Sequence, residues 1–289
     1  MKLEASCTLT VTAAVDTPLV AMLRPRSGSA QWIIADRYEL QPWVPTTEYV
    51  DSYGNLCQRL VVPRGEMHIE VEVTMEVEPQ IAVEPLAPVT PIEHLPDDAL
   101  LYLLQSRYCP SDKMAERARE IVGDALPGYA QVERIRSWIH HNLEYKYGVS
   151  EATTDAMDTL NHGAGVCRDF SHVGIALCRS LQIPPRIVLG YLHGLDPVDL
   201  HAWFEAFVGG RWYTFDATQA QPVGGCIVLA YGRDAADVAF ISDYGGTPLK
   251  VDEVKVAVSA CQTADDARII PPPLDSQPVT RNEAPPLWS

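Results

Sequence analysis

Apolar and polar residues alternate with a period of two through the first part of the chain, which is typical of half-buried strands. Between residues 3 and 11 the odd positions are apolar or cysteine, and the even positions are Glu, Ser or Thr. The alternation over 67–77, with mainly Glu at its even positions, predicts a long strand with one solvated face. Residues 51–55 (DSYGN) have the composition of a turn. We therefore predict an antiparallel sheet or sandwich over residues 1–93, closed by the Pro-rich stretch Pro79–Pro96.

A helical period replaces this alternation further along the chain. Apolar residues recur at three- and four-residue spacing over 132–143 and indicate a helix that ends near Asn142. A second helix is expected from about Cys167 to Leu181, where the apolar residues again share one face and Pro184-Pro185 follows. Shorter helices are expected to begin near Asp97 and Ser111.

The remainder is strand-like. The expected strands are Arg186–Tyr191, His201–Val208, Arg211–Thr218, Ile227–Tyr231 and Val251–Val258. Helices followed by an antiparallel sheet give an α+β domain, which we place at residues 94–266. Residues 267–289 form a Pro-rich tail with no apolar period, predicted to be an unpacked extension.

Charge and cysteine content narrow the possible functions. Against 38 acidic residues there are 22 Lys and Arg, a formal net charge of −16, so neither nucleic acid nor an anionic membrane is an expected partner. The first residues contain Glu4 and no apolar block, and no apolar run is long enough to span a bilayer, so a cytoplasmic location is expected. The seven cysteines include no C-x-x-C pair, and neither a metal nor a cofactor is predicted.

Cys167 is the strongest candidate for a reactive residue. It follows the sequence Gly-Ala-Gly-Val at the expected start of a helix, where backbone N–H groups and the helix dipole stabilise negative charge. The preceding glycines allow a substrate carbonyl to approach the backbone, and the N–H of Cys167 is a candidate donor to an oxyanion. Cys178, on the same helix, is instead expected to be a buried small side chain.

His201 and Asp216 are predicted to meet through the register of a hairpin. If Gly209-Gly210 is a two-residue turn, Trp203 lies opposite Asp216, so that His201 and Asp216 are diagonal neighbours on one face. Their Cα atoms would be ~7–8 Å apart, a separation that an imidazole and a carboxylate can bridge. Cys167, His201 and Asp216 would then supply a nucleophile, a base and a carboxylate that orients the base.

The residues around Cys167 have simpler explanations. Asp169 in the first helical turn is expected to serve the helix dipole, and Arg168 to pair with an acid or with a substrate carboxylate. His162 and His172 flank Cys167 but lack the spacing of metal ligands. Asp234 and Asp237 are expected to be turn and capping residues, and Trp203 and Trp212 to be core or cleft-wall residues.

Several segments together resemble the transglutaminase-like superfamily of papain-type cysteine enzymes. They are Gly165–Phe170, Leu181–Arg186, Gly190-Tyr191, His201–Trp203 and Phe215–Thr218. Gly232–Asp237 and the β-rich amino-terminal part resemble the bacterial branch. The sequence has Asp-Ala-Thr where the family usually has Asp-Pro-Thr, and Pro185 where Ala is usual.

The resemblance implies a papain/transglutaminase-like core with Cys167 as nucleophile, His201 as general base and acid, and Asp216 as the orienting carboxylate. It suggests Tyr145 or Tyr147 as a second oxyanion donor, and we predict Tyr147 as the site residue. Val166 and Trp203 are further candidates for substrate or oxyanion contacts.

The expected chemistry is acyl transfer through a thioester, with a protein or peptide as substrate. If water releases the acyl group, the enzyme is a protease or amidase; if a lysine amine does, it is a transglutaminase. Bacterial relatives favour the hydrolase. A third possibility is a binding module that retains the fold without catalysis.

Overall fold

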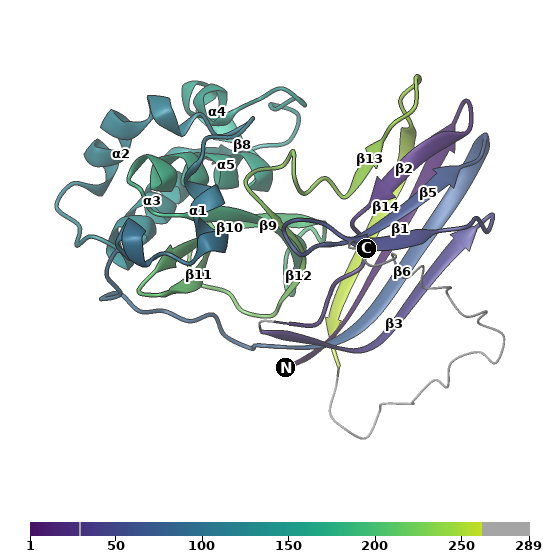
Figure 1. The fold of residues 1–289 in the computed structure, drawn as a ribbon, viewed down its shortest axis with the longest axis horizontal. Coiled ribbons are helices and arrows are strands. Elements are labelled where there is room, and N and C mark those ends of the chain that lie inside the picture. Colours follow the sequence, from purple (N-terminus) through teal and green to yellow (C-terminus); the bar gives the residue numbers. More distant parts are fainter. Residues whose placement is uncertain (29, 262–289) are drawn as a thin grey trace, which may run out of the picture.

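Two four-stranded antiparallel sheets form one part of the molecule, and a third sheet covered by helices forms the other (Figure 1). The computed structural model describes residues 1–28 and 30–261. An all-β amino-terminal part followed by an α+β core confirms the predicted fold class. The predicted tail over residues 267–289 lies outside the described residues.

The amino-terminal part is a sandwich of two sheets with strand orders β14-β1-β6-β3 and β13-β2-β5-β4. Its first six strands are β1 (Lys2–Ala13), β2 (Thr17–Ala21), β3 (Gln31–Gln41), β4 (Thr47–Val50), β5 (Leu56–Val62) and β6 (Gly65–Val77). The odd positions of β1, and of β6 from Met67 onward, are buried, as their alternation predicts, and they join Leu19, Leu23 and Leu60 in one core. Burial of these apolar faces holds the two sheets together.

The last two strands belong to the amino-terminal sheets. β14 (Lys250–Ala260) pairs with β1 from Leu3↔Ala260 to Thr12↔Lys250, and β13 (Ile241–Asp243) pairs with β2. The prediction that the second domain continues without interruption to residue 266 is therefore wrong. Alternation identifies 251–258 as a strand, but it does not say which distant strand supplies the hydrogen-bond partners.

The second part contains helices packed on the sheet β11-β10-β9-β12. Its helical elements are η1 (Ile92–His94), α1 (Asp97–Leu100), η2 (Leu101–Leu103), η3 (Ser111–Lys113), α2 (Ala115–Val122), α3 (Tyr129–Asn142), α4 (Ala156–His162) and α5 (Cys167–Ser180). Its strands are β7 (Glu144–Tyr145), β8 (Ala164–Gly165), β9 (Pro185–Leu192), β10 (His201–Val208), β11 (Arg211–Phe215) and β12 (Cys226–Gly232). In the described part of the chain, no helix is long and apolar enough to cross a membrane.

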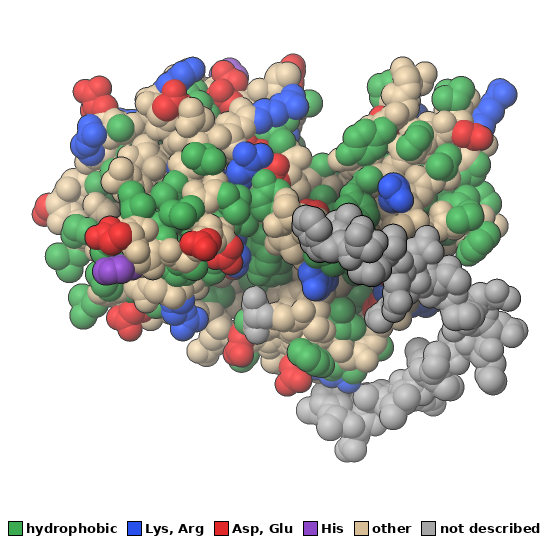
Figure 2. Space-filling model, in the orientation of Figure 1, with side chains coloured by type: hydrophobic (Ala, Val, Ile, Leu, Met, Phe, Trp, Pro, Cys, Tyr) green, Lys and Arg blue, Asp and Glu red, His purple; other side chains and the backbone are tan. Residues whose placement is uncertain are grey.

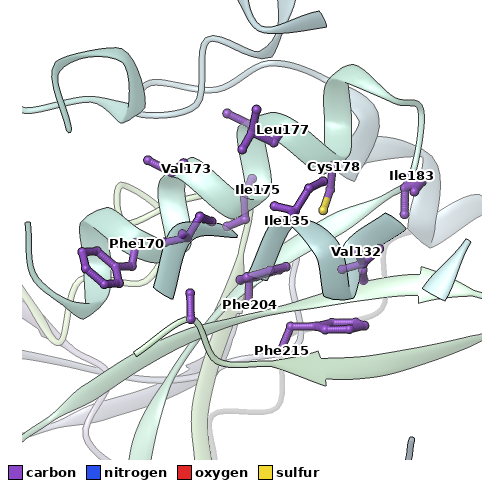
Figure 3. Close-up of a cluster of buried hydrophobic side chains, with 14 of the residues drawn as sticks. Val132, Ile135, Phe170, Val173, Ile175, Leu177, Cys178, Ile183, Phe204 and Phe215 are labelled. Carbon is purple, nitrogen blue, oxygen red and sulfur yellow. The ribbon is translucent and has the colours of Figure 1, made fainter. Parts of the chain in front are cut away.

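Helix α5 lies at the centre of this second part. Ile175 of α5 lies beside Ile135 of α3, and Phe204 of β10 lies across from them (Figure 3). Cys178 is fully buried in the same cluster, as expected of a small core side chain. The position of α5 is therefore set by contacts on both its helix-facing and its sheet-facing sides.

The other face of the third sheet packs on the amino-terminal part. Tyr191 of β9, with Ile227 and Leu229 of β12, belongs to the hydrophobic core of the amino-terminal sheets. Figure 2 shows an indentation between the two parts on one side of the molecule, and both parts carry charged side chains. The third sheet thus lies between the helices and the amino-terminal sandwich.

Candidate active site

The local structure before α5 places Cys167 at the helix start. Val166 is the N-cap residue, and its backbone N–H donates to Oδ2 of Asp169 over 3.0 Å. A Cβ at position 165 would lie 2.7 Å from Cβ of Asp169, so a glycine is needed for this close turn. Arg168 donates to Oδ1 of Asp169 from Nε and Nη2, over 3.0 and 2.8 Å. Asp169 therefore caps the helix, as predicted, and Arg168 pairs with it.

This arrangement occupies one predicted oxyanion donor. Val166 was a candidate for a substrate or oxyanion contact, but its N–H is already bonded to Asp169. The backbone N–H of Val166 is therefore not a free oxyanion donor. The N–H of Cys167, in the first turn of α5, remains the backbone candidate.

The hairpin brings His201 and Asp216 together in the predicted register. Val208 pairs with Arg211 and Phe204 with Phe215 across β10 and β11, which confirms the two-residue turn. Nε2 of His201 and Oδ2 of Asp216 are 2.7 Å apart. This contact leaves Nδ1 of the imidazole as the ring nitrogen available to the Cys167 side chain.

Thr218 fixes the second carboxylate oxygen of Asp216. Oδ1 accepts hydrogen bonds from the backbone N–H of Thr218 over 2.9 Å and from its hydroxyl over 2.7 Å. Sequence reasoning did not assign Thr218 a role, although the Asp-Ala-Thr motif contained the signal. A threonine two residues after an aspartate can close this turn with both of its donors.

The surroundings of His201 favour its charged form. Burial opposes the charge, but hydrogen bonds and charge interactions with Asp216 and Cys167 outweigh it and raise the pKa of His201 to about 10. Only 2% of the His201 surface is exposed, whereas Cys167 is half-buried. An imidazolium next to a half-exposed sulfur suits acyl-transfer chemistry.

Tyr145, rather than the predicted Tyr147, contacts the Cys167 backbone. Burial and the nearby Cys167 raise the pKa of Tyr145, while a hydrogen bond from the backbone of Cys167 acts in the opposite direction. The parallel bridge of β7 with β8 pairs Tyr145 with Gly165, two residues before Cys167. Tyr147 lies further out, with its ring packed edge-on against Tyr145 at 5.6 Å.

Trp203 lies beneath the site. It is 2% exposed, and a Cβ on Gly190 would lie 2.8 Å from its Cη2 atom. Its ring centroid is 5.9 Å from that of His201. Trp203 therefore supports the imidazole from the core, as the expectation of a core or cleft-wall residue had it, and its direct contact with substrate stays a prediction.

A pocket of about 130 Å³ opens beside His201. Its walls come from Tyr145 and Tyr147, from Thr218 and Gln219, and from the loop between β9 and β10 at residues 195–200. Cys167 does not line it. The pocket is therefore bounded by the histidine rather than by the cysteine.

The remaining candidates serve the fold. Nε2 of His172 accepts the N–H of Ala235, and burial lowers the pKa of His172 to about 4. Asp234 accepts the N–H groups of Tyr108 and Ala236, as a turn and capping residue would. Among the described residues, no group of three or more His, Cys, Asp or Glu side chains is arranged to hold a metal ion.

Known proteins share this arrangement of parts. Residues 115–217 match the Transglutaminase-like superfamily, and residues 12–78 match the Bacterial transglutaminase-like N-terminal region. The crystal structure of a "Putative Cysteine Protease from Cytophaga hutchinsonii" is 32% identical, with a TM-score of 0.83, and the alignment covers 91% of each chain. The chain belongs to the transglutaminase-like superfamily.

A curated relative is similar over most of its length. The uncharacterized protein ML0607 of Mycobacterium leprae is 29% identical over 249 residues, which are 80% of this chain and 88% of that protein. The aligned stretch is longer than either part of this chain, so the similarity includes residues of both.

Proposed function

We propose that the protein is a cysteine-dependent amidase or protease in which Cys167, His201 and Asp216 act as a triad. The observation that carries the proposal is the 2.7 Å contact between His201 and Asp216 beside a cysteine at a helix start. The superfamily supports enzyme-like activity, and the neighbour from Cytophaga hutchinsonii supports the choice of a cysteine protease.

In the first half-reaction, the Cys167 thiolate attacks the carbonyl carbon of the amide. The candidate donors to the developing oxyanion are the O–H of Tyr145 and the N–H of Cys167, which is released when the oxyanion replaces its hydrogen bond to Tyr145. The tetrahedral intermediate collapses as the C–N bond breaks, and imidazolium His201 gives its proton to the leaving nitrogen. The acyl group is then held as a thioester on Cys167.

In the second half-reaction, His201 is neutral and acts as a general base. It takes a proton from water as the water oxygen attacks the thioester carbonyl. The C–S bond breaks, and the products are a carboxylic acid, the Cys167 thiolate and imidazolium His201. A primary amine in place of water would give a new amide, which is the transglutaminase reaction.

The test begins with the reactivity of the sulfur. Wild type, Cys167→Ala and His201→Ala are treated briefly with iodoacetamide between about pH 5 and 9, and each cysteine is quantified by mass spectrometry. A thiolate–imidazolium pair predicts that Cys167 is alkylated at the acid end of this range, and that this labelling depends on His201. Buried Cys178 is the internal control.

A casein assay with and without a dansylated primary amine then shows whether water or an amine accepts the acyl group. Release of peptides that requires Cys167 supports the hydrolase, whereas dye incorporation without peptide release supports the transglutaminase. If Cys167 labels no faster than an ordinary exposed thiol and neither product forms, the non-catalytic binding module replaces both.

A further inference from the structure

The pocket beside His201 is lined by groups that attract cations. Tyr145 and Tyr147 are 42% and 59% exposed, and their rings meet edge-on across a centroid distance of 5.6 Å. The opposite loop contributes Asp196 and Asp199, both exposed. Exposed aromatic faces and carboxylates around one cavity favour an ammonium or guanidinium group.

These two carboxylates are not neutralised by the protein itself. Within residues 1–28 and 30–261, neither Asp196 nor Asp199 forms an ion pair with Lys, Arg or His. Asp199 accepts the N–H of Leu200 through Oδ1 over 2.7 Å, and among the described residues Oδ2 has no hydrogen-bond donor. The positive charge of His201 in the same pocket is already matched by Asp216.

The position of the pocket identifies which end of a substrate would enter it. His201 delivers a proton to the leaving nitrogen in the proposed reaction, so the group attached to that nitrogen lies on the histidine side of the sulfur. The pocket is lined by His201 and not by Cys167. Its occupant therefore belongs to the leaving side of the scissile amide.

We infer that this pocket binds a lysine or arginine side chain immediately after the scissile bond, and that Asp196 and Asp199 determine this specificity. The inference rests on the proposed function, because it uses the direction of proton transfer from His201. The net charge of −16 acts in the same sense, since it attracts cationic substrates at long range.

The first experiment is cleavage-site profiling with a proteome-derived peptide library, read by mass spectrometry. For wild type we expect Lys and Arg after the cut to exceed Asp and Glu by about tenfold at low salt, and by less at high salt because mobile ions screen the carboxylates. The double variant Asp196→Asn with Asp199→Asn should reduce this ratio of basic to acidic residues severalfold. The double variant Asp196→Lys with Asp199→Lys should make acidic residues the preferred ones. Glu116→Gln, an exposed acidic residue on α2, is the matched control and should keep the wild-type ratio.

The second experiment does not require chemistry. Fluorescent peptides beginning with Lys or with Glu represent the leaving product, and their binding to the Cys167→Ala variant is measured by anisotropy. Tighter binding of the Lys peptide, lost in the double Asn variant, supports the inference even if no amide is cleaved. The inference would be overturned by a wild-type profile without preference for basic residues, or by a preference that is unchanged in the double Asn variant. Failure of Cys167-dependent cleavage alone would instead count against the proposed function.

Discussion

Gly174 on α5 lies directly against the ring of Phe204 on β10: a Cβ at position 174 would be 2.5 Å from Cε1 of that ring. Phe204 is fully buried, so its ring cannot move out into solvent. Because α5 begins at Cys167 and β10 begins at His201, this contact sets the spacing between the sulfur and the imidazole. Helix and strand meet here with only the Phe204 ring between them.

Gly174→Ala should disturb both stability and chemistry. The added methyl overpacks the core, so we expect the free energy of unfolding to fall by about 1–3 kcal/mol, and labelling of Cys167 by iodoacetamide at acid pH to decrease. Urea denaturation and mass spectrometry measure the two effects. Gly246→Ala is the control, because a Cβ there would meet nothing within 4 Å. If Gly174→Ala changed neither the free energy of unfolding nor the labelling of Cys167, α5 would be able to shift freely on the sheet.

Thr218→Val removes the hydroxyl that holds Oδ1 of Asp216 and retains the backbone N–H bond. A hydrogen bond to a charged group contributes about 1.5–3 kcal/mol, so turnover should fall by about tenfold or more without loss of folding. The rate of peptide release and the circular dichroism spectrum are compared with those of Thr8→Val, on the outer face of β1. A normal rate in Thr218→Val would show that Asp216 is held without this hydroxyl.

The raised pKa of His201 gives stability a definite pH dependence. Because the folded-state pKa, about 10, exceeds the usual 6.5, the charged histidine stabilises the fold fully below about pH 6.5, and this contribution is lost as pH rises through 10. Asp216→Asn removes a main cause of the shift. The difference in unfolding free energy between wild type and this variant should therefore be largest near pH 6 and shrink toward pH 10.5.

Urea denaturation across that range measures the difference. Asp112→Asn, an exposed change in η3, is the control and should show no such trend. A gap between wild type and Asp216→Asn that stays constant or widens with pH would contradict a charged His201. Peptide release should also decline above about pH 10, because neutral His201 cannot protonate the leaving amine.

The amino-terminal sandwich holds the edge strand of the third sheet through two amide side chains. Nδ2 of Asn55 donates to the Tyr231 carbonyl, and Oδ1 accepts the Tyr231 N–H, each over 2.8 Å. Gln31 makes the same pair of bonds with Val228, over 2.9 and 2.7 Å. Both side chains thus mimic a neighbouring strand along β12.

Asn55→Ala should loosen this junction. Asn55 is 3% exposed, and its loss leaves the backbone groups of Tyr231 without these partners, so we expect destabilisation by about 1–3 kcal/mol. Thermal unfolding and limited proteolysis report the effect, with earlier cleavage between the two parts. Asn142→Ala, which removes one exposed hydrogen bond to Trp138, is the control. Equal melting temperatures for the two variants would argue against a structural role for the junction.

The sequence alone was sufficient for several elements and for the hairpin register that brings His201 to Asp216. Alternation over residues 3–11 and 67–77 identified two strands and their buried faces, because burial of one face imposes a period of two. The glycine pair at 209–210 determined the hairpin register, and with it the contact of His201 with Asp216. These are local relations, and short-range geometry decides them.

Tertiary structure decided the relations between distant segments. The apolar pattern of β14 does not contain the information that its partner is β1, about 250 positions earlier in the chain. Nor does the sequence say whether Tyr145 or Tyr147 lies next to Cys167. The β7–β8 bridge decides this, because it pairs Tyr145 with Gly165. Strand partners and pocket walls depend on which surfaces bury each other once the whole chain is packed, whereas a local pattern records only that a residue is buried.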